Sequence, residues 1–104
     1  MIERRNSIMN TTYTPKPLDT SDVQLSEDIL ELTEKLAENT HEVWAAERIA
    51  QGWRYGEERN DAEKLHPCLV EYDKLSDSEK TFDRSTALET LKCIMKLGYK
   101  IEKA

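Results

Sequence analysis

Aromatic and cationic side chains gather in one stretch near the middle of the sequence. Trp44 and Arg48 are four residues apart, and Trp53, Tyr55 and Arg59 follow within eleven further positions. Indole rings stack on nucleobases, and guanidinium groups hold phosphate through paired hydrogen bonds. This combination predicts a binding site for a planar, anionic ligand such as a nucleotide, formed by Trp44, Arg48, Trp53, Tyr55 and Arg59.

The same aromatic residues also have a structural interpretation. A tryptophan on a helix of a small domain usually belongs to the core or to a subunit interface, and a neighbouring arginine often covers the ring with its aliphatic stem. His66, which precedes Pro67, is better explained as part of a turn than as a ligand. A ligand site and a contact with another protein therefore both stay open for this stretch.

Other combinations of polar residues do not predict catalysis or metal binding. Glu38 and His41 have the i, i+3 spacing of di-iron helical bundles, but the sequence has no second Glu-x-x-His motif. A zinc-protease motif needs a second histidine four positions after His41, where Ala45 stands. No serine or cysteine lies in a nucleophile elbow, and no glycine-rich loop precedes a helix. We therefore expect a protein that is not an enzyme and uses no metal or cofactor.

The composition is typical of a small, highly charged, folded protein. Of its 104 residues 35% are charged and 38% are hydrophobic, and the formal net charge is -6. This length supports one domain. The negative charge argues against binding to nucleic-acid polymers, because cationic surfaces supply most of that affinity. The two cysteines, Cys68 and Cys93, are expected to be core residues and not a disulfide framework.

No segment of the sequence predicts contact with a membrane. No window approaches the roughly 18 consecutive apolar residues of a membrane span. The first ten residues lack the apolar block of a signal peptide. We therefore expect a cytoplasmic protein.

The first long helix is predicted from Ser26 to Gln51. Ser26 precedes two acidic residues, as an N-cap residue does, and Gly52 follows at the end. A helix of this length rises about 39 Å, so either it kinks near 39–40 or another subunit covers part of its apolar side. Apolar or small residues recur every three to four positions, and we expect these to face the core: Ile29, Leu32, Leu36, Val43, Ala46 and Ala50.

The second long helix is predicted from about Asp77 to Leu97. Ser76 and Glu79 form a capping box before it, and Gly98 follows it. Its core side is expected to contain Ala87, Leu88, Leu91, Ile94 and Met95.

Turn residues dominate the segment between the two helices, where one short strand is expected at 68–70; a second is expected at 99–101. Residues 1–12 are expected to form a flexible tail. The prolines of the arm that follows exclude a helix there. The predicted fold is mainly α, an antiparallel pair of long helices with short extended or β segments, in one domain over residues 13–104.

The order of the motifs resembles the RyR domain, the repeat first described in ryanodine receptor calcium channels and also found in small stand-alone bacterial and phage proteins. The resemblance extends from Tyr13 to about Ile101, so it includes most of the chain. The motifs that carry it are Tyr13-Thr-Pro-Lys-Pro, Leu36-Ala-Glu-Asn, His41-Glu-Val-Trp, Arg48-Ile, Gly52-Trp-Arg-Tyr-Gly, Arg59-Asn-Asp, His66-Pro-Cys-Leu-Val, Glu89-Thr-Leu-Lys and Leu97-Gly-Tyr.

The resemblance implies a partner and a ligand. Receptor repeats occur in tandem and pack about a pseudo-twofold axis, so a single copy implies a homodimer. The receptor repeats hold an adenine-nucleotide or related ligand between paired repeats, and this implies that Trp44, Arg48 and Arg59 bind it, with Trp53 and Tyr55 as neighbours. Channel activity is not implied, because this chain has no span from which to build a pore.

The sequence therefore predicts a non-enzymatic, cytoplasmic RyR-domain module that self-associates and binds a small anionic, nucleotide-like ligand. The alternative is a protein–protein interaction module with no small-molecule ligand. A third interpretation is an accessory to a nucleotide-processing or phage-defence enzyme, but no motif in the sequence indicates this role.

Overall fold

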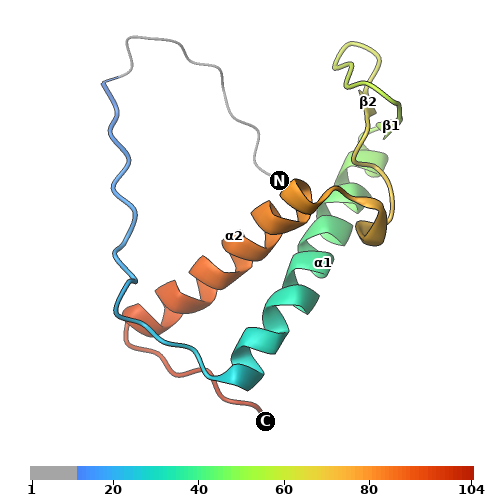
Figure 1. The fold of residues 1–104 in the computed structure, drawn as a ribbon. Coiled ribbons are helices and arrows are strands. Elements are labelled where there is room, and N and C mark those ends of the chain that lie inside the picture. Colours follow the sequence, from blue (N-terminus) through green and yellow to red (C-terminus); the bar gives the residue numbers. More distant parts are fainter. Residues whose placement is uncertain (1–11) are drawn as a thin grey trace.

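Two long helices and an irregular segment between them make up residues 12–104, the part of the chain that the computed structural model describes (Figure 1). The helices run in opposite directions and pack against each other. The elements in chain order are α1 (Glu27–Ala50), β1 (Arg54–Tyr55), β2 (Leu65–His66), the 3-10 helix η1 (Tyr72–Lys74) and α2 (Asp77–Lys96). This confirms the mainly α fold with short β segments that the sequence predicts.

Local signals set the ends of both helices. The hydroxyl of Ser76 accepts a hydrogen bond from the backbone N–H of Glu79 at 3.3 Å, which caps α2. Ser26 occupies the N-cap position of α1, but its hydroxyl donates to the carboxylate of Asp28 instead. Gly52 follows the C-terminal end of α1 with φ of +94°, a conformation that glycine adopts without steric cost.

The side of α1 that packs inside the fold is not the predicted one. The buried residues are Ile29, Ala37, His41 and Trp44, so only Ile29 of the predicted core side is buried. Leu32, Leu36 and Val43 are 39%, 37% and 49% exposed, and Ala46 and Ala50 are exposed too. The prediction was wrong because it left two large rings, His41 and Trp44, out of the core. α1 is one uninterrupted helix through this region.

On α2 the predicted core side is largely confirmed. Ala87 and Leu91 are buried, and Leu88 and Met95 are half-buried. Ile94 departs from the prediction, since 37% of it is exposed.

The main core cluster lies where the irregular segment folds back over α1. It contains Ala37, Trp44, Cys68, Tyr72 and Leu75. The phenol of Tyr72 donates a hydrogen bond to Glu34 at 2.7 Å, and Arg84 of α2 donates two hydrogen bonds to the same carboxylate. Burial and the hydrogen bond to Glu34 raise the pKa of Tyr72 to about 12. The contacts of Glu34 with Tyr72 and Arg84 therefore join η1, α1 and α2.

The two short strands lie outside the predicted positions. β1 and β2 form a parallel pair in which Arg54 is opposite Leu65 and Tyr55 is opposite His66. The predicted strand at 68–70 is absent because the chain turns there: the backbone N–H of Cys68 donates to Nδ1 of His66 at 3.0 Å, and Cys68 enters the core. Residues 99–101 are irregular, so the second strand prediction was also wrong.

The arm before α1 is extended, as its prolines require. Residues 12–19 are exposed, and Thr20 is buried against α2, where its hydroxyl donates to Glu89 at 2.8 Å. The tail predicted for residues 1–12 lies almost entirely outside the described residues. Within residues 12–104, neither helix contains an apolar window long enough to cross a membrane.

Candidate functional site

A row of five rings leads from the surface into the core at the C-terminal end of α1. The neighbouring ring centroids are 6.2 Å apart for Trp53 and His66, 4.9 Å for His66 and Trp44, 5.6 Å for Trp44 and His41, and 6.1 Å for His41 and Tyr72. We call these five residues the aromatic row. Trp53 is half-buried and the other four are buried, so Trp53 is the end of the row that solvent reaches.

Trp44 occupies the middle of this row. It is 9% exposed, its ring stacks on His41 with an interplanar angle of 29°, and the edge contact with His66 has an angle of 74°. Protein therefore covers its ring. Trp44 packs α1 against the segment that contains β2.

Arg48 and Trp53 form a pair at the surface. Cζ of Arg48 lies 5.4 Å from the centroid of the Trp53 ring, within the range of a cation–π contact. The backbone N–H of Trp53 donates to the carbonyl of Arg48 at 2.9 Å, so the end of α1 fixes the two residues relative to each other. The guanidinium of Arg48 also donates to Gln51 Oε1 at 3.0 Å. The end of α1 therefore brings Arg48 and Trp53 together.

Tyr55 and Arg59 complete the surface beside this pair. Tyr55 is 54% exposed and is paired with His66 across the two strands, which places it next to the aromatic row. Nε of Arg59 donates to Asp61 Oδ1 at 2.8 Å, and this hydrogen bond lowers the pKa of the Asp61 carboxyl. One edge of the Arg59 guanidinium is therefore already occupied by an anion.

The five predicted residues thus lie at the same end of the molecule, but they differ in access. Arg48, Trp53, Tyr55 and Arg59 are half-buried or exposed, whereas Trp44 is buried. We call the first four the α1-end surface. A ligand that binds this conformation meets these four side chains and not the ring of Trp44.

Two buried polar side chains, His41 of the aromatic row and Asp83 of α2, have hydrogen-bonding atoms in the interior. Nε2 of His41 lies 2.7 Å from the carbonyl oxygen of Val70 and, since a carbonyl only accepts, donates a hydrogen bond to it. Nδ1 of His41 and Oδ2 of Asp83 are buried without a hydrogen-bond partner among residues 12–104. Asp83 is 1% exposed, and burial raises the pKa of its carboxyl.

The sequence analysis missed Asp83, although a signal was present. Asp83, Ala87 and Leu91 are spaced four apart, so a carboxylate lies on the buried side of α2. Within residues 12–104, the histidine, cysteine and acidic side chains do not form a group of three that holds a metal ion.

The sequence also matches a known protein family. The match extends over residues 13–103 and is to the family model of the RyR domain. It includes both helices, the segment between them and the arm, and therefore every residue of the aromatic row.

Proposed function

We propose that this chain, which belongs to the RyR domain family as its motifs predicted, is a binding module without enzymatic activity. Its ligand on this proposal is a small, planar, anionic molecule of the nucleotide type. The α1-end surface receives it. The observation that carries the proposal is the guanidinium of Arg48 beside the accessible ring of Trp53, at 5.4 Å.

The chemistry of the four side chains fits such a ligand. The rings of Trp53 and Tyr55 offer flat surfaces on which a base stacks. Arg48 and Arg59 offer guanidinium groups for the anionic end, with charge-assisted hydrogen bonds. No bond is made or broken in this mechanism.

The contacts within the chain define what binding must displace. The carboxylate of Asp61 holds Arg59, and the amide oxygen of Gln51 holds Arg48. A phosphate exchanges one or both of these contacts, so the net gain is smaller than for two unoccupied arginines. We therefore expect modest affinity that falls as the salt concentration rises.

Trp44 has a supporting role in this proposal. Its ring holds His66, and His66 lies beside both Trp53 and Tyr55. Replacing Trp44 would therefore disturb the α1-end surface through packing, and loss of binding in such a variant would not identify a contact.

Calorimetric titration with a panel of adenine and guanine nucleotides tests the proposal. We expect heat with at least one of them, and about tenfold weaker binding for Tyr55→Ala, as one lost stacking contact implies. Tyr99→Ala is the matched control, because Tyr99 is also an exposed tyrosine, at 68%, but lies beyond the C-terminal end of α2. The absence of heat with every nucleotide, or equal affinity in Tyr55→Ala and wild type, would overturn the proposal.

A second candidate function is a protein–protein interaction module with no small-molecule ligand. The observation in its favour is that Leu36 and Val43 remain 37% and 49% exposed on one side of α1. A protein that gives no heat with nucleotides but forms a stable complex through this side would have this function instead.

We also propose that the protein is cytoplasmic. The observation in support is that both Cys68 and Cys93 are free thiols, which a reducing compartment preserves. Fractionation of cells that express the chain tests this location, and its recovery with secreted proteins would contradict it.

A further inference from the structure

Lys64 has an unusual backbone conformation beside the α1-end surface. Its φ is +56°, and among residues 12–104 no other residue except glycine has a positive φ. Residues with a side chain adopt this left-handed region rarely, because the Cβ crowds the backbone. Strain of this kind persists only where the surrounding structure imposes it, and it clusters at functional sites. An exposed lysine gains nothing from this conformation unless its contacts depend on it.

Lys64 makes two hydrogen bonds to the chain that follows α1. Its ammonium donates to the carbonyl oxygen of Gln51 at 2.9 Å, and its own carbonyl accepts from the backbone N–H of Arg54 at 2.9 Å. Two residues, Gly52 and Trp53, separate these partners. We call residues 51–54 the corner and the two hydrogen bonds the Lys64 clamp. One lysine therefore spans the corner from which the ring of Trp53 projects.

Gly52 leaves room for the clamp. Its φ is +94°, and a Cβ added to it would lie 3.9 Å from both Cδ and Nζ of Lys64. The stem of Lys64 therefore passes over Gly52 on its way to the carbonyl of Gln51. In the left-handed conformation, both the side chain and the carbonyl of Lys64 reach the same stretch of chain. This is what the strained backbone achieves.

The charge of Lys64 suits the end of a helix. The last carbonyls of a helix lack partners within it and carry partial negative charge, so a lysine ammonium is stabilised there. Gln51 is the C-cap residue of α1. Its side chain accepts from Arg48 at 3.0 Å, whereas its backbone carbonyl accepts from Lys64. An anion that takes Arg48 away from the Gln51 side chain therefore leaves the clamp in place.

Trp53 owes its position to the clamp and to one further hydrogen bond. It lies between α1 and β1, outside both elements. Its backbone N–H donates to the carbonyl of Arg48, and the clamp holds the residues on either side of it. Its ring centroid then lies 5.4 Å from Cζ of Arg48 and 6.2 Å from the ring of His66. A loose corner would release this ring from both neighbours.

We propose that Lys64 is a positioning residue of the α1-end surface, which holds the corner so that the ring of Trp53 stays beside Arg48 for the ligand. Lys64 does not contact the ligand itself. The inference rests on the proposed function for its ligand, but the corner is present without one. The positioning can therefore be measured in the ligand-free chain.

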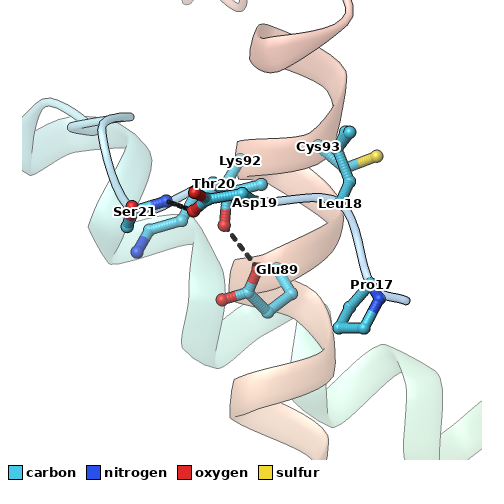
Figure 2. A pocket seen from close by; sticks show the side chains of 8 residues that line it. All are labelled: Pro17, Leu18, Asp19, Thr20, Ser21, Glu89, Lys92 and Cys93. Carbon is cyan, nitrogen blue, oxygen red and sulfur yellow. Dashed lines mark hydrogen bonds between the residues drawn. The ribbon is translucent and has the colours of Figure 1, made fainter. Parts of the chain in front are cut away.

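Nuclear magnetic resonance relaxation of the ligand-free chain and three variants tests the positioning. Lys64→Met removes the ammonium, whereas Lys64→Arg keeps a cationic donor. Both keep a Cβ, so the backbone strain is the same in each. Lys92→Met is the control, because it removes the same charge from α2, where Lys92 lies beside Glu89 and Cys93 at the arm (Figure 2).

We expect the order parameters of the corner and of the Trp53 indole N–H to fall in Lys64→Met, from about 0.85 toward about 0.6. They should keep their wild-type values in Lys64→Arg and in Lys92→Met. A residue that only stabilises the fold would change the midpoint of unfolding without changing the mobility of the folded corner. Unchanged order parameters in Lys64→Met would overturn the proposal.

Calorimetric titration of the same variants with nucleotides separates this inference from the ligand proposal. We expect Lys64→Met to bind about fivefold more weakly than wild type, and Lys64→Arg and Lys92→Met to bind within about twofold of it. If wild type binds no nucleotide but the corner of Lys64→Met is mobile, Lys64 holds the corner and only the ligand proposal fails. Unchanged affinity in Lys64→Met would overturn the positioning role and leave the ligand proposal standing.

Discussion

Replacing Asp83 by asparagine should stabilise the protein at neutral pH. The carboxyl of Asp83 is 1% exposed, its Oδ2 lacks a hydrogen-bond partner among residues 12–104, and burial raises its pKa. A raised pKa means that the folded state holds the proton more tightly than the unfolded state. The stability that the protonated carboxyl contributes is present below the unfolded pKa near 3.8 and is lost as pH rises through the higher folded pKa. Above the folded pKa the chain carries this cost in full.

The size of the effect follows from the burial of one unsatisfied polar atom. Such an atom costs about 1–3 kcal/mol, and more when it is charged. An asparagine at this position would keep the shape of the side chain and remove the charge, so we expect Asp83→Asn to recover about 1–2 kcal/mol at pH 7. For a domain of this size that corresponds to a rise in Tm of roughly 4–15 °C.

Thermal and urea unfolding of the two proteins from pH 3 to pH 8 measures this. The difference in stability should be large at neutral pH and should shrink toward pH 3, where the carboxyl of Asp83 is protonated. Asp73→Asn, which changes an exposed carboxylate in η1, is the control and should have little effect. If Asp83→Asn were instead less stable than wild type at pH 7, the carboxylate of Asp83 would stabilise the fold, and the reasoning would be refuted.

Three further variants probe the contacts that hold the site in place. Gly56→Ala should destabilise the protein by about 1–3 kcal/mol in urea unfolding, because an added Cβ would lie 2.7 Å from Cβ of Leu65; an unchanged midpoint would contradict the close approach of the two strands. Trp44→Ala should cost about 3–5 kcal/mol, as removal of a core ring does, and a loss below about 1 kcal/mol would show that the ring is not packed. Glu34→Gln should lower the pKa of Tyr72 from about 12 in an ultraviolet titration, and no shift would mean that burial alone raises it.

The helices were predictable because their signals are local. Ser76 and Glu79 lie three positions apart and form their contact within one turn, and a glycine stands shortly after each helix. The two-residue strands carry no such signal. Their pairing is fixed by the close approach of Gly56 to Leu65, which are nine positions apart.

The buried side of α1 could not be assigned from periodicity alone. Two sides of this helix carry apolar residues, and spacing does not state which of them the rest of the chain covers. Which side of α1 is buried depends on rings from other segments: His66 packs on Trp44, and Tyr72 lies beside His41. Most of the apolar side that was predicted as core, including Leu36 and Val43, lies at the surface instead.

The candidate site was predictable only where its residues are close in sequence. Arg48 and Trp53 are close in sequence, and the end of α1 brings them together. The burial of Trp44 and the contact of Arg59 with Asp61 depend on how the connecting segment folds, so the residue types alone did not reveal them.

Nuclear magnetic resonance of the uniformly labelled chain during a nucleotide titration tests the central claim most directly. The two indole N–H signals report separately on the half-buried Trp53 and the buried Trp44. We expect the Trp53 signal and the backbone signals of 48–61 to shift with saturation, while the backbone signal of Thr86 in α2 stays unchanged. Shifts confined to residues of α2, or no shifts with any nucleotide, would contradict the assignment of the α1-end surface as the binding site.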